Sequence, residues 1–132
     1  MRRIVLATVL AAAGGTAQAA EVDITCKIAR AEDLVNGALV RAPVDGPWNF
    51  TITPDGLKTP WGGSCAVMTG EVNSDRVSVS CEKTLSETTT VKRTVAIDRH
   101  LGTYKEYFEV PRGIGPASIR YSDGVCEKRE GF

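Results

Sequence analysis

Histidine, catalytic motifs and metal-binding spacings are scarce or absent in this chain of 132 residues. Its one histidine, His100, lies in an expected turn, and Ser64 lacks the G-x-S-x-G elbow that exposes a nucleophilic serine. Acid–base and nucleophilic catalysis most often need a histidine beside a partner group. There is no Cys-x-x-Cys, and His100 is not spaced with any cysteine as zinc ligands are. The sequence therefore predicts a protein that is not an enzyme and that needs no metal or other cofactor.

An excess of charge of one sign is also missing. The chain has 16 Lys and Arg against 16 Asp and Glu. Surfaces that bind nucleic acid or anionic membranes are usually strongly basic. We therefore expect no nucleic-acid partner.

Long apolar runs are missing after the first residues. Met1-Arg2-Arg3 forms a short basic region, an apolar run covers 4–13, and Ala17-Gln18-Ala19 fits the small-x-small cleavage rule. The run is shorter than the roughly 20 residues of a membrane span. Residues 1–19 are therefore predicted to be a signal peptide, and an uncleaved N-terminal anchor is the alternative. Export to the periplasm or secretion follows, with no membrane span in the mature chain.

Alternation of apolar and polar residues runs through residues 20–132. A period of two indicates strands with one buried face, and glycine- and proline-bearing turns separate the segments. The alternation is clear at 22–28, 48–52, 76–81, 90–98, 104–110 and 117–121. The pattern predicts a single all-β domain. We expect an antiparallel meander of about six to eight strands that forms a small barrel or sandwich.

One stretch, residues 29–41, is open to two interpretations. Asn36-Gly37 between two apolar pairs is a strong signal for a two-residue hairpin turn. The same residues permit a short helix from Ala31, with Gly37 just past its end. The β character of the neighbouring segments favours the hairpin.

The four cysteines survive removal of residues 1–19 and predict two disulfides in an exported domain. Residues 64–82 read as a hairpin with a turn centred on Asn73. That register sets Cys65 opposite Cys81 on the apolar face, with Val67 opposite Val79. Pairing Cys65 with Cys81 leaves Cys26 and Cys126 to join the first strand to the last.

The run from Val95 to Tyr104, with the late Gly124-Val125-Cys126, resembles a C-terminal pattern in short exported bacterial proteins of unknown function. Those proteins have an Ile-Asp/Asn-Arg-x-x-Gly turn followed by a late Gly-x-Cys or Gly-Cys. The resemblance implies no activity. The overall plan is also similar to small periplasmic lysozyme-inhibitor barrels, an analogy of fold alone.

Two loops are candidate binding surfaces. Residues 98–102 carry Arg99 and His100, and residues 111–116 carry Arg112. Loops on a disulfide-stabilised β scaffold are common recognition surfaces, and arginine pairs well with a carboxylate of a partner. The alternative is that both are ordinary solvated turns.

The remaining candidate residues are interpreted by whether their side chains are expected to face the core or the solvent. Trp48 alternates in phase with buried positions and is assigned to the core, whereas Trp61 precedes two glycines and would anchor an interface if exposed. Glu106 and Glu109 are expected at solvated positions. Arg93 interrupts an otherwise apolar face of its strand.

Binding is the function class that these features favour. We predict a non-catalytic binding or inhibitory module whose partner is another exported or envelope protein. A structural accessory of the cell envelope without a small ligand is the alternative. An exposed aromatic or arginine cluster beside a concave surface would favour the binding module.

Overall fold

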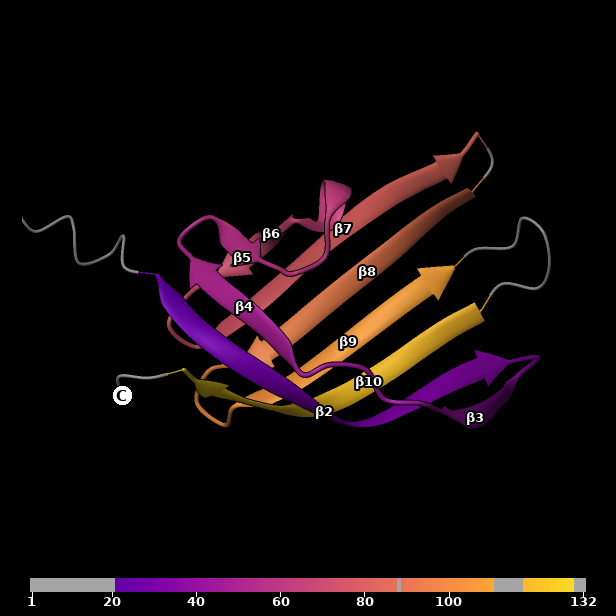
Figure 1. Cartoon of the computed structure of the whole chain (residues 1–132), viewed down its shortest axis with the longest axis horizontal. Helices are drawn as coiled ribbons and strands as arrows, with labels where there is room; N and C mark the ends of the chain where they lie inside the picture. The colour runs from indigo at the N-terminus through magenta and orange to yellow at the C-terminus, as the bar shows by residue number, and fades with distance from the viewer. Residues whose placement is uncertain (1–20, 88, 111–117, 130–132) are drawn as a thin grey trace, which may run out of the picture.

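The computed structural model describes residues 21–87, 89–110 and 118–129, which form one antiparallel sheet (Figure 1). The predicted signal peptide, residues 1–19, lies outside these ranges. One short 3-10 helix, η1 (Gly63–Cys65), precedes β6. The strands are β2 (Val22–Val35), β3 (Ala38–Ala42), β4 (Trp48–Thr53), β5 (Gly56–Lys58), β6 (Val67–Val72), β7 (Arg76–Ser86), β8 (Thr89–Asp98), β9 (Thr103–Val110) and β10 (Ser118–Lys128).

The sheet closes into a barrel. From β4 to β10 each strand pairs with the next in sequence, and β10 then pairs with β2, which also pairs with β4. Eight strands therefore form the closed barrel, and β3 is an extra strand beside β2. The all-β prediction is confirmed, and the barrel is the form that the structure has.

The long strand β2 pairs with three other strands. One of its edges pairs with β10 from Ile24 to Leu34. Its other edge pairs first with β4 and then, from Ala31 to Val35, with β3. Asn36 and Gly37 form the turn with positive φ angles of 51° and 82°, as two-residue hairpin turns require. The hairpin predicted for residues 29–41 is confirmed, and the helical alternative is wrong.

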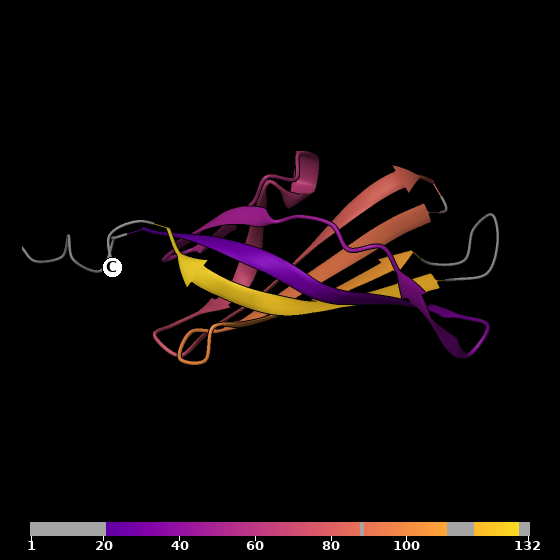
Figure 2. The same cartoon turned by 60° about the horizontal axis from the view of Figure 1, so that its bottom comes forward.

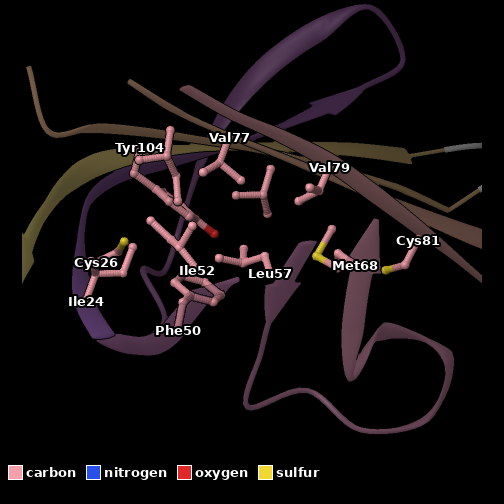
Figure 3. Packing of buried hydrophobic residues seen from close by; sticks show 12 residues of the cluster. Ile24, Cys26, Phe50, Ile52, Leu57, Met68, Val77, Val79, Cys81 and Tyr104 are labelled. Atoms are coloured by element: carbon pink, nitrogen blue, oxygen red, sulfur yellow. The ribbon is translucent and has the colours of Figure 1, made fainter. Parts of the chain in front are cut away.

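The core fills the barrel with inward side chains at every second position. In Figure 3 the side chains of Phe50, Leu57, Val77 and Val79 point toward one another from facing strands. The buried cluster consists of Ile24, Cys26, Phe50, Ile52, Leu57, Met68, Val77, Val79, Cys81, Val95, Ile97 and Tyr104. Trp48 packs against this cluster, as predicted.

Both predicted disulfides are present. Cys26 lies directly opposite Cys126 in the β2–β10 register, with the Cα atoms 3.9 Å apart. Cys65 is bonded to Cys81 with a Cα–Cα distance of 5.3 Å. Disulfides are typical of proteins in oxidising compartments. No helix in the described ranges is long and apolar enough to cross a membrane.

The predicted hairpin register around the second disulfide is wrong. Thr69 pairs with Ser80 instead of Val77, a shift of three residues. The turn lies after Asn73, whose side-chain Oδ1 accepts hydrogen bonds from the backbone N–H groups of Asp75 and Arg76 at 2.8 and 3.0 Å.

An odd shift turns the other face of β6 inward. Met68 is therefore fully buried, and Val67, predicted to face the core, is exposed. Cys65 does not lie in β6; it reaches Cys81 from η1, where the Ser64 hydroxyl also donates to the carbonyl of Glu82 at 2.6 Å.

Candidate functional site

An arginine lies inside the barrel, at the position that interrupts the apolar face of β8. Val95 and Ile97 are buried, and alternation places Arg93 on the same inward face. Its guanidinium stacks 3.9 Å from the ring centroid of Trp61 and 4.5 Å from that of Phe108. A cation over aromatic faces is stabilised by the ring quadrupoles.

Glu106 neutralises this arginine, so its predicted solvated position is wrong. Its Oε2 lies 3.1 Å from Arg93 Nε, and its side chain is 9% exposed. The Tyr104 hydroxyl donates to Glu106 Oε1 at 2.6 Å. Burial, helped by the negative charge of Glu106, raises the pKa of Tyr104 far above its usual value, so the phenol stays a donor. Tyr104, Glu106 and Phe108 share one parity on β9, a signal that the sequence contained.

Trp61 is part of the same cluster. Its ring meets Trp48 and Phe50 edge-on, with centroids 5.4 and 5.3 Å apart. Its indole N–H is buried and has no acceptor among the described residues. The Trp61 ring therefore packs against the guanidinium of Arg93 and the core, and it is not an exposed interface anchor.

A second ion pair lies on the inward face of β10 and β2. Arg120 donates to both carboxylate oxygens of Asp33, at 2.6 and 3.0 Å. A second carboxylate oxygen, Asp45 Oδ2, lies 3.8 Å from Arg120 Nη1. The hydrogen bond from Arg120 lowers the pKa of Asp33. Arg93 and Arg120 thus already have carboxylate partners within the chain, which supports a structural role.

Arg99 and His100 are also engaged within the chain. Arg99 Nη1 donates to the Asn73 carbonyl at 2.7 Å, and its backbone N–H donates to the Asp75 carbonyl at 2.8 Å. His100 Nε2 lies 2.7 Å from Asp75 Oδ1, and this partner raises the pKa of His100. Both residues tie the β8–β9 turn to the β6–β7 turn. They do not contact the Trp61 cluster, and Arg112 lies outside the described residues.

A concave surface of the described chain lies on the outer face of β8, β9, β10 and β2. It is a groove of about 370 Å³. We call it the tyrosine groove. Tyr107 and Tyr121 lie directly opposite each other in the β9–β10 register, with ring centroids 5.3 Å apart and planes at 75°. The charged side chains around them are Arg30, Glu32, Lys105 and Asp123.

The groove is open to solvent and is lined by the two tyrosine rings and by charged side chains. Tyr121 is 40% exposed, and Arg30 forms an ion pair with Asp123 at 3.2 Å, in which both side chains are largely exposed. Partial burial, together with the charge of Glu109, raises the pKa of Tyr107, so its hydroxyl remains protonated at neutral pH. The groove therefore offers two phenols and charges of both signs to a ligand.

Sequence reasoning missed the tyrosine groove. Tyr107 has the parity opposite to Tyr104 and Phe108, which marks it as outward-facing. In the sequence, Tyr121 has the same parity as Ile119, an apolar strand position. The contact between the two tyrosines depends on the β9–β10 register, which the sequence between the two strands does not determine.

In the described ranges, no three His, Cys, Asp or Glu side chains are grouped so that they could hold a metal ion. Comparisons with known proteins add no relative, since no protein-family model, curated protein or solved structure matches the chain. The functional argument therefore depends on the geometry of this barrel.

Proposed function

We propose that this protein is an exported, periplasmic or secreted, non-catalytic binding module that recognises another exported or envelope protein through the tyrosine groove. The observation that carries the proposal is the contact of the half-buried Tyr107 with the exposed Tyr121 in a concave surface between charged side chains. The two disulfides and the signal-like residues 1–19 support the extracytoplasmic location.

The residue types in the groove suit a protein partner. Tyrosine and arginine are enriched at the centres of protein interfaces, because their side chains bury large areas and still form hydrogen bonds. Mixed charges such as Lys105 and Glu32 fix orientation and exclude partners with the wrong pattern. Arg93 and Arg120 are neutralised by inward-facing carboxylates, whereas the groove presents Tyr121 and the solvent-exposed Arg30–Asp123 pair to a partner.

The test compares capture by three forms of the oxidised domain from residue 20 onward. Wild type, the Tyr107→Ala/Tyr121→Ala variant and the Val125→Ala variant are immobilised and exposed to extracytoplasmic extract of the source organism. Val125 is a matched control, because it is an exposed residue of the same strand, β10. A protein captured by wild type is then purified, and its affinity is measured by calorimetry.

The double tyrosine variant should lose about 30-fold or more in affinity, as expected for two interface anchors. The Val125→Ala variant should change affinity less than about twofold. Equal binding by all three forms would rule out the groove as the binding surface. Capture of no protein by wild type would instead favour the structural accessory of the envelope.

A further inference from the structure

The β2–β3 hairpin projects from the barrel with apolar side chains on both faces. Leu39 is 57% exposed, Val40 51% and Val35 40%. Both views show the hairpin at the end of the molecule opposite the start of β2 (Figures 1 and 2). The other edge of β2 pairs with β10 as far as Leu34, so β3 is the outermost strand of the sheet at this end.

The outer edge of β3 is unpaired in the described part of the chain, where β3 pairs only with β2. The two-residue turn makes Val35 and Ala38 a hydrogen-bonded pair, and such pairs alternate along an antiparallel ladder. Val40 and Ala42 therefore point their backbone groups toward β2. Leu39 and Arg41 point theirs toward the unpaired edge.

Apart from its length of five residues and the charge of Arg41, this edge lacks the features that normally prevent strand addition. Proteins protect exposed edges with proline, lysine, bulges or short strands. The strand Ala38-Leu39-Val40-Arg41-Ala42 has neither proline nor lysine, and its pairing with β2 shows no bulge. Its one charge, Arg41, lies opposite Glu32 within its own hairpin.

We propose that β3 pairs antiparallel with β3 of a second copy of this chain, about a two-fold axis at Val40. The sheet then continues from one barrel into the other. This surface is separate from the tyrosine groove, so the proposal does not depend on the proposed function.

The symmetry and the hydrogen-bond pattern fix the register. Residues that point their backbone groups outward must face each other, so the axis passes through Leu39, Val40 or Arg41. An axis at Arg41 sets two like charges opposite each other, which is unfavourable. An axis at Val40 pairs all five residues of both strands.

In this register Leu39 of each copy lies opposite Arg41 of the other, and about four N–H···O bonds form. Ala38 lies opposite Ala42, so the small side chains at both ends do not clash. The two Val40 side chains meet at the axis, in a pair whose Cα atoms lie about 4.5 Å apart. The strand thus pairs with itself without a steric clash and without like charges opposite each other, which favours a second copy over an unrelated partner.

Sedimentation velocity of the oxidised mature protein from about 5 to 500 μM tests the proposal. The weight-average mass of wild type should rise with concentration toward twice the monomer mass. Val40→Lys places two charges at the axis, and Leu39→Pro removes an outward N–H without breaking a β2–β3 bond. Both variants should remain monomeric over the whole range. Val67→Lys, a charge on an equally exposed valine of β6, should behave as wild type.

Cysteine cross-linking tests the register. Under mild oxidation, Val40→Cys should give a covalent dimer, and Leu39→Cys should not, because the two Leu39 residues lie diagonally apart. Circular dichroism and the unfolding midpoint establish that each variant is folded. A wild-type mass that stays monomeric to 500 μM would overturn the proposal, and so would dimers of Val40→Lys. Cross-linking at Leu39 instead of Val40 would refute the register.

Discussion

The contribution of the Arg93–Glu106 pair to stability can be tested with one isosteric substitution. Glu106→Gln keeps the shape of the side chain and an oxygen that accepts from Tyr104. It removes the negative charge 3.1 Å from Arg93 Nε. The arginine would then lie inside the barrel, 20% exposed, without its counter-ion.

The expected magnitude follows from the environment of Arg93. Removing one partner of a buried ion pair costs about 3–5 kcal/mol. The rings of Trp61 and Phe108 still stabilise the cation, by about 0.5–2 kcal/mol. We therefore expect Glu106→Gln to lower the free energy of unfolding by about 2–3 kcal/mol. With a urea dependence of about 1–1.5 kcal/mol/M for a domain of this size, the midpoint falls by about 2 M.

Equilibrium unfolding in urea, followed by tryptophan fluorescence, measures this loss. Glu71→Gln is the matched control. Glu71 Oε1 lies 3.2 Å from Arg76 Nη2, a similar distance, but this ion pair is on the surface. The control substitution should cost less than about 0.5 kcal/mol. The double variant Arg93→Met/Glu106→Gln should be more stable than Glu106→Gln alone, since the uncompensated charge is gone. A cost for Glu106→Gln no larger than that of Glu71→Gln would refute the buried-pair argument.

The remaining predictions concern the Cys65–Cys81 disulfide, the pKa of His100 and the close contact at Gly124. The Cys65→Ala/Cys81→Ala variant should fold and lose about 3 kcal/mol in urea unfolding, the value for a loop of 16 residues. The pKa of His100, read by NMR titration, should lie above 6.5 and return toward 6.5 in Asp75→Asn. Because the folded-state pKa is raised, the stabilisation from this pair is fully present below pH 6.5 and is lost as pH rises through the folded-state pKa. Gly124→Ala should lower the free energy of unfolding by about 1–3 kcal/mol, because a Cβ there would collide with a carbonyl of β2.

The sequence predicted elements whose signals are local. Alternation identified the strands, and Asn36-Gly37 identified a hairpin turn. The Cys65–Cys81 pairing was correct although the register that predicted it was wrong, because Cys65 reaches Cys81 from η1. The β6–β7 register was wrong because it depends on which residues form the turn, and the Asn73 side chain decides that. Both possible registers gave apolar inward residues, so burial alone could not distinguish them.

The candidate site was harder to predict for a related reason. Arg93 and Glu106 come from neighbouring strands, and each looks like an exception on its own strand. Only the β8–β9 register shows that the two exceptions neutralise each other. Tyr107 and Tyr121 likewise become a pair only when β9 and β10 are aligned.

The extra strand follows from unequal strand lengths. β2 has 14 residues, whereas β4 has 6 and covers only the first part of one β2 edge. β3 pairs with the rest of that edge and acquires an unpaired edge of its own. The outer part of β7, beyond its pairing with β6, raises the same problem on the other side of the barrel. There η1 lies against the strand, held by the Cys65–Cys81 disulfide and by the Ser64 hydroxyl on the Glu82 carbonyl. Because β7 has this cover and β3 has no counterpart in the described ranges, self-association is expected at β3.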